Sequence, residues 1–74
     1  MKTGEAVRSI MKEKGVGTNA LAARLNKKQN VISERLGQEN ISVSKLNEML
    51  RVLDYKVVLV PRESRVPEGG YEVE

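Results

Sequence analysis

Residues 21–37 decide the fold, and they read LAARLNKKQNVISERLG. Apolar side chains recur at helical spacing on both sides of the polar residues in the middle of this stretch. Asn26 tolerates the left-handed backbone conformation in which helices often end, so it can turn the chain sharply without a glycine. The stretch therefore predicts two short helices, residues 18–25 and 28–36. The polar residues 27–30 between them are either a solvated turn or a binding surface.

Two more helices are expected on either side of this pair. Thr3, Thr18 and Ser42 can cap the first, second and fourth helices, because their hydroxyls can accept from free backbone N–H groups. The first helix is expected to run to about Lys14 and the fourth to Asp54. The side chains at helical spacing that we expect to form the core are Leu21, Leu25, Ile32, Leu36, Leu46, Met49, Leu50 and Leu53.

The hydrophobic period changes after the fourth helix. Residues 56–60 read KVVLV, a continuous β-branched run that is typical of a strand covered on both faces. Gly69-Gly70 marks a turn, and residues 71–74 alternate apolar with polar. They are either a short second strand beside the first or the end of a disordered acidic tail. We expect a domain of residues 1–60 that ends in a strand, followed by an acidic tail of residues 61–74.

Composition excludes several classes of function. The chain of 74 residues has no cysteine and no histidine, which excludes a thiolate nucleophile, an imidazole base and a zinc site of the usual kind. It has no clustered carboxylates and no glycine-rich phosphate loop, so we expect neither an enzyme nor a bound cofactor. No export signal and no apolar run of about 18 residues is found, so we expect a cytoplasmic protein without a membrane partner.

The charge is distributed unevenly along the chain. Residues 1–62 carry 12 basic and 6 acidic side chains, so their net charge is +6. Residues 63–74 carry 1 basic and 4 acidic side chains, so their net charge is −3. A basic domain is typical of a protein that binds nucleic acid, although the same charge can serve as a solubilising surface.

Two short helices joined by a tight turn, in a basic helical domain, can lay the second helix into a DNA major groove. The helices must approach closely, which requires a small residue at their contact. Ala22 is at that position, Asn26 is at the turn, and Ile32 is where the second helix packs into the core. Their spacings of four and six residues match the helix-turn-helix pattern.

Residues 18–50, TNALAARLNKKQNVISERLGQENISVSKLNEML, resemble the lambda-repressor-like, Xre-type helix-turn-helix family of bacterial and phage transcriptional regulators. The resemblance covers residues 3–60 and is most specific at Thr18, at Leu21-Ala22, at Ile32-Ser33 and in residues 41–55. It implies an all-α fold, a compact bundle of four or five helices, here with a short C-terminal β-strand. It also implies a homodimer that binds operator DNA.

Three positions depart from the family pattern. Asn26 replaces the usual glycine of the turn, which its chemistry permits. Lys27 and Arg35 stand where the family more often has apolar residues. The packing of the third helix in the bundle therefore depends on what these two side chains contact.

The resemblance implies that Gln29 and Asn30 lie at the exposed start of the reading helix. Their amides can donate to adenine and accept from it at the same time, and a Glu carboxylate can accept from the amino group of cytosine. The base-reading residues implied are Gln29, Asn30, Ser33 and Glu34. The alternative is that these are ordinary polar residues of a helix surface, with Glu34 paired to Arg35.

Contacts with DNA phosphates are implied around this helix, where they would fix its register without reading sequence. The residues implied are Thr18, Asn19, Lys27, Lys28, Asn40 and Lys45. Lys27 and Lys28 can equally be solvated charges.

A run as apolar as residues 56–60 is a problem for so small a chain, because four helices can cover only one face of the strand. We therefore expect Val57, Val58, Leu59 and Val60 to pair or pack with the same segment of a second chain across a two-fold axis. This homodimer would hold two reading helices one DNA turn, ~34 Å, apart.

Three functions are compatible with these features. The first is sequence-specific binding of double-stranded DNA, at an inverted-repeat operator, by a small homodimeric transcriptional regulator that acts as a repressor. The second is an antitoxin with the same DNA-binding core, whose tail, residues 62–74, wraps and neutralises a basic toxin protein. The third is a helical adaptor that binds no nucleic acid.

Overall fold

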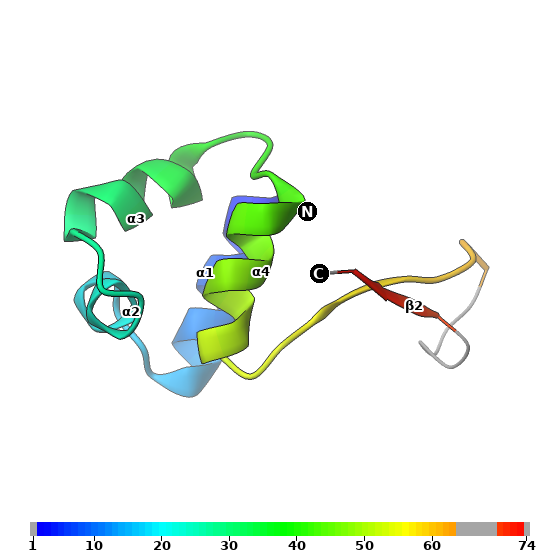
Figure 1. Ribbon diagram of the computed structural model, residues 1–74, viewed down its shortest axis with the longest axis horizontal. Helices are drawn as coiled ribbons and strands as arrows, with labels where there is room; N and C mark the ends of the chain where they lie inside the picture. The colour runs from blue at the N-terminus through cyan, green and yellow to red at the C-terminus, as the bar shows by residue number, and fades with distance from the viewer. Residues whose placement is uncertain (1, 64–69, 74) are drawn as a thin grey trace.

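The computed structural model describes residues 2–63 and 70–73. Within them the chain forms, in order, α1 (Thr3–Lys14), α2 (Thr18–Arg24), α3 (Gln29–Gly37), α4 (Val43–Val52), β1 (Val57–Leu59) and β2 (Tyr71–Val73). Helices α2 and α3 lie at one end of the long axis, and the strands lie at the other (Figure 1). None of the helices described is long and apolar enough to cross a membrane.

The four predicted helices are confirmed to within about two residues at each end. The cap of α4 is also confirmed, because the Ser42 hydroxyl accepts from the backbone N–H of Lys45 at 3.3 Å. The caps predicted at Thr3 and Thr18 are wrong. Each is the first residue of its helix, and the residue before it makes no side-chain cap bond. Thr3 instead accepts from the backbone N–H of Ile41 at 3.4 Å, which ties the start of α1 to the segment before α4.

The core lies among the four helices and consists of aliphatic side chains and methionines. Six of the eight predicted core residues are buried, and the other two, Leu25 and Leu46, are half-buried against the core. The buried hydrophobic residues are Val7, Met11, Val16, Leu21, Ala22, Ile32, Leu36, Ile41, Met49, Leu50 and Leu53.

The strands form an antiparallel hairpin in which Val57 faces Val73 and Leu59 faces Tyr71. Of the two alternatives for the end of the chain, the short second strand is therefore confirmed for residues 71–73, while residues 64–69 lie outside the described residues. The hairpin is attached to the helices by Asn47, a buried residue of α4 whose side-chain amide donates to the carbonyl oxygen of Val73 at 2.6 Å. Val57 adds apolar packing against the core.

Candidate nucleic-acid interface

The turn between α2 and α3 has the geometry that the sequence predicts. Asn26 adopts a left-handed conformation with φ of 56°. Its N–H donates to the carbonyl of Ala23 at 3.1 Å, and the N–H of Lys27 donates to the carbonyl of Ala22 at 2.9 Å. These two bonds make a Schellman motif, which satisfies the last carbonyls of α2 and reverses the chain. Ala22 and Ile32 are buried, as predicted, so the two helices approach closely.

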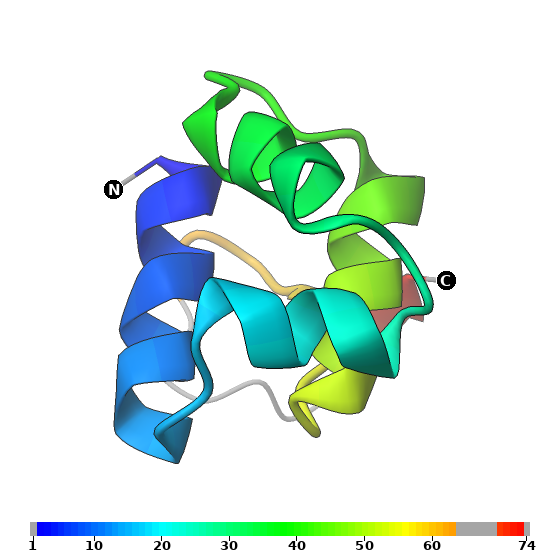
Figure 2. The ribbon, with the colours of Figure 1, turned by 90° about the vertical axis from the view of Figure 1, so that its left-hand side faces the viewer.

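Helix α3 separates its residues into an inward and an outward face. Ile32, Arg35 and Leu36 are buried. The predicted base-reading residues share the outward face and are all exposed: Gln29, Asn30, Ser33 and Glu34. Figure 2 looks onto α2 and onto the start of α3, which project from the end of the molecule opposite the hairpin. Side chains on this face can therefore reach a partner without any change of fold.

The predicted phosphate-binding residues lie in three places around the start of α3. Thr18 and Asn19 begin α2, Lys27 and Lys28 form the turn that precedes α3, and Asn40 and Lys45 lie before and within the first turn of α4. The three places surround the start of α3 rather than forming one cluster (Figure 2). Asn19, Lys28, Asn40 and Lys45 are exposed, whereas Thr18 and Lys27 are half-buried.

Arg35 is the one charged residue that α3 buries, and its side chain is only 10% exposed. Its guanidinium donates to the carboxylate of Glu48 on α4, with 2.5 Å between the nitrogen and the oxygen. The alternative of a surface pair between Glu34 and Arg35 is therefore wrong for Arg35, which turns inward to α4. This ion pair is the contact that places the charged side chain of Arg35 on the inward face of α3.

The same carboxylate is also affected by a charge in the turn. The pKa of Glu48 is lowered from its ordinary value because Arg35 donates a hydrogen bond to it and adds an attractive charge, to which the charge of Lys27 contributes further. Partial burial acts in the opposite direction and does not cancel these effects. Glu48 is therefore ionised at neutral pH and attracts a cation from α3 and another from the turn before it.

A glycine holds the other end of α3 against α1. Gly4 is buried in the first turn of α1, and a Cβ atom added there would overlap the carbonyl oxygen of Leu36. The backbones of α1 and α3 can therefore approach only because residue 4 has no side chain.

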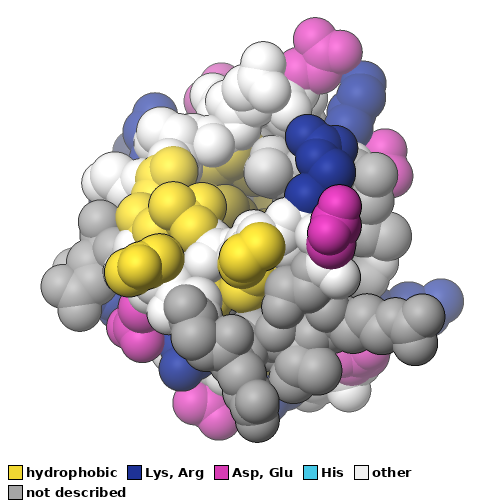
Figure 3. Space-filling model, turned by 90° about the vertical axis from the view of Figure 1, so that its right-hand side faces the viewer, with side chains coloured by type: hydrophobic (Ala, Val, Ile, Leu, Met, Phe, Trp, Pro, Cys, Tyr) yellow, Lys and Arg dark blue, Asp and Glu magenta, His cyan; other side chains and the backbone are white. Residues whose placement is uncertain are grey.

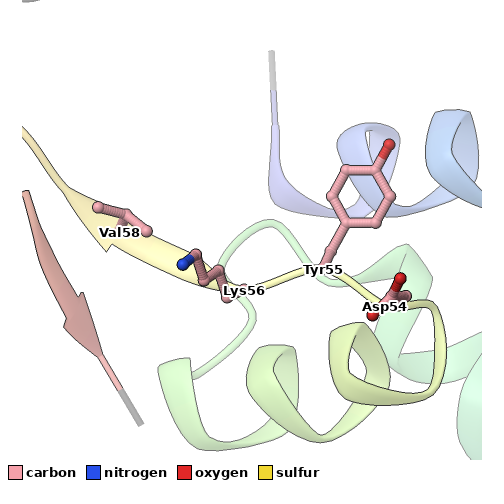
Figure 4. A pocket seen from close by; sticks show the side chains of 4 residues that line it. All are labelled: Asp54, Tyr55, Lys56 and Val58. Carbon is pink, nitrogen blue, oxygen red and sulfur yellow. The ribbon is translucent and has the colours of Figure 1, made fainter. Parts of the chain in front are cut away.

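A hollow in the described surface is unrelated to this interface. It measures about 640 Å³, is wide open, and is lined by Asp54, Tyr55, Lys56 and Val58. Figure 4 shows that these four side chains do not converge on a common point. Tyr55 instead turns to α1, where its hydroxyl donates to the Glu13 carboxylate at 3.2 Å, a contact that raises the pKa of Tyr55. The hollow is thus the outer side of the segment that connects α4 to β1.

The residues expected at a dimer interface differ in their surroundings. Val57 and Val58 are half-buried, whereas the side chains of Leu59 and Val60 are 61% and 40% exposed. Tyr71, opposite Leu59, is 77% exposed, and Figure 3 shows hydrophobic side chains gathered on this end of the molecule. One edge of β1 is paired with β2 of the same chain, so pairing with a second chain would have to use the other edge of β1 or the edge of β2.

Three residues that hold this arrangement together were not anticipated from the sequence: Gly4, Asn47 and Glu48. A glycine inside the first turn of an expected helix is the one signal that could have indicated a close contact, because glycine disfavours helices. Asn47 and Glu48 are polar residues beside the apolar stripe of α4, and nothing local distinguishes them from a solvated face. Comparison of the chain with protein-family models, with curated proteins and with solved structures gives no match.

Proposed function

We propose that the protein binds double-stranded DNA in a sequence-specific manner, as a small homodimeric transcriptional regulator of lambda-repressor-like fold that acts as a repressor. The observation that carries this proposal is the exposed polar face of α3. The Schellman turn at Asn26 holds this helix next to α2, at the end of the molecule opposite the hairpin. A short helix that projects from a compact support is the form that enters a major groove.

The chemistry of the exposed face supports base reading. Gln29 and Asn30 begin α3, and their amides can each make two hydrogen bonds to the edge of an adenine. Glu34 can accept from cytosine, and Ser33 can bond to several bases. These side chains make no hydrogen bond or ion pair within the described part of the chain, so binding DNA would break no such internal contact.

The charge of the domain supports phosphate contacts. With a net charge of +6, residues 1–62 attract a polyanion. Four of the expected phosphate-binding residues are exposed: Lys28, Lys45, Asn19 and Asn40. They can hold the DNA backbone on either side of the groove that α3 enters. Binding should weaken steeply as salt is added, because each phosphate contact releases counterions.

A dimer is part of this proposal, and the shape of the chain restricts it. The molecule is 37 Å long and carries the hairpin at the end opposite α2 and the start of α3. Two chains joined end to end would hold their α3 helices farther apart than one DNA turn, ~34 Å. We therefore propose that the chains cross at Leu59 and Tyr71 and lie side by side, which would bring the two α3 helices closer together and cover these exposed apolar side chains.

Replacing Gln29 with Ala tests the reading role of α3. We expect the best operator to bind more weakly by about 1–3 kcal/mol, with a relaxed preference at one base pair. Gln38→Ala is the matched control, because Gln38 is also exposed and directly follows the last residue of α3. Fluorescence anisotropy with operator duplexes and their single-base variants measures both effects. Equal losses in the two variants would remove the support for α3 as the reading helix.

The exposed hairpin also suits a protein partner, so an antitoxin that binds operator DNA and neutralises a toxin is the second candidate. Residues 71–73 are paired with β1, so a toxin would have to bind the hairpin as it is folded or displace β2. A basic protein that co-purifies with the chain and loses affinity on Leu59→Lys would favour this function over a free repressor.

A further inference from the structure

We propose that Glu48 is a positioning residue for the base-reading surface: it does not face DNA, but it holds α3 at the angle that determines which bases the helix reads. This inference rests on the proposed function. It assigns part of the sequence preference to a residue of α4, outside the helix-turn-helix pair.

Helix α3 is held by backbone and apolar packing and by one ion pair. Helix α3 packs mainly on α2 and α1, and the described residues connect it to α4 by one ion pair, between Arg35 and Glu48. Ile32 and Leu36 make apolar contacts with the core. These contacts and the close approach of Gly4 to Leu36 limit how far α3 can move, but they do not orient a particular polar group. The hydrogen bond from Arg35 to Glu48 is directional, so it favours one rotation of α3 within these limits.

The ion pair resists displacement because Arg35 is buried. A guanidinium that loses its carboxylate inside a protein is left without compensation for its lost hydration. Helix α3 therefore cannot roll away from α4 without a large penalty. Arg35 directly follows Glu34 and lies two residues after Ser33, so any roll of the helix moves these exposed side chains across the groove.

Lys27 extends the effect to the start of α3. It is half-buried in the turn, and its charge acts on the Glu48 carboxylate. One anion on α4 thus attracts cations on both sides of Gln29 and Asn30. Lys28 is exposed, so it is the more available phosphate contact of the turn.

Glu48→Gln tests the inference, and Glu13→Gln is its matched control. Both changes remove one negative charge, but Glu13 lies on α1 and contacts Tyr55. In Glu48→Gln we expect the amide resonances of residues 29–36 to shift. We also expect the ratio of operator affinity to non-specific affinity to fall by about tenfold, which is the loss that removal of one base contact would cause. In Glu13→Gln we expect both to stay as in the wild type. Unchanged α3 resonances and an unchanged ratio in Glu48→Gln would overturn the inference.

The double variant Arg35→Met/Glu48→Leu separates positioning from stability. The pair is partly buried, with the Arg35 side chain 10% and the Glu48 side chain 43% exposed, and replacing such a pair with apolar side chains often preserves stability. We expect this variant to melt no earlier than the wild type and yet to select a different operator. A stable double variant with the wild-type operator would contradict the inference. If the wild type itself prefers no DNA sequence, the proposed function fails, while the α3 resonances of Glu48→Gln still decide whether Glu48 positions the helix.

Discussion

At the scale of single residues, Asn26 controls the turn between α2 and α3. Its φ of 56° lies in the region that costs most L residues roughly 1–2 kcal/mol and that glycine adopts freely. Asn26→Gly should therefore leave the free energy of unfolding unchanged or slightly higher, whereas Asn26→Val should lower it by about 1–2 kcal/mol. Urea denaturation followed by circular dichroism measures both values. Equal stability of the two variants would contradict the role given to this residue.

Gly4 is a second residue whose effect can be measured against a control. Alanine normally stabilises a helix by up to about 1 kcal/mol relative to glycine. At Gly4 the added methyl group would overlap the Leu36 carbonyl, so Gly4→Ala should lower the free energy of unfolding by about 1–3 kcal/mol. Gly37→Ala should raise it, because nothing lies within 4 Å of a Cβ at Gly37. Thermal melting compares the two, and a stabilised Gly4→Ala variant would show that α1 and α3 do not meet there.

The Glu48 carboxylate predicts a pH dependence of stability. Its pKa in the folded chain is lowered from the ordinary value of 4.5, chiefly by the hydrogen bond from Arg35. A group with a lowered pKa stabilises the fold at pH values above its unfolded pKa, and this contribution is lost as pH falls through the folded pKa. The wild type should be more stable than Glu48→Gln at neutral pH, and the difference should shrink as pH falls below 4.5. Urea titrations at several pH values measure the difference, and a constant difference would contradict the ion pair.

At the scale of elements, the helices and the turn could be predicted because their signals are local. The spacing of apolar residues, the Ser42 cap and the conformation of Asn26 depend on neighbours within a few residues. Strand β2 stayed ambiguous because three alternating residues form a strand only if other elements support them. Arg35 and Asn47 bond to groups 13 and 26 residues away, so periodicity gives no indication of either contact. The surface that could bind DNA was therefore predictable, but its support from α4 was not.

At the scale of the whole molecule, self-association should depend on the hairpin. Leu59 is 61% exposed, so Leu59→Lys should leave the fold intact while placing a charge in the proposed dimer contact. Sedimentation should give a dimer for the wild type and a monomer for this variant, with weaker operator binding. Val43→Lys is the control, because Val43 is 46% exposed at the start of α4, outside the hairpin. A Leu59→Lys variant that remains a dimer would place the interface elsewhere.

We propose that α3 of each chain in a dimer reads DNA sequence. Selection of bound duplexes from a random pool tests this proposal, because every possible operator sequence competes for the protein in the same tube. We expect enrichment of one inverted repeat, with half-site centres about one helical turn, or 10 base pairs, apart. Enrichment of no sequence over the starting pool would contradict the claim.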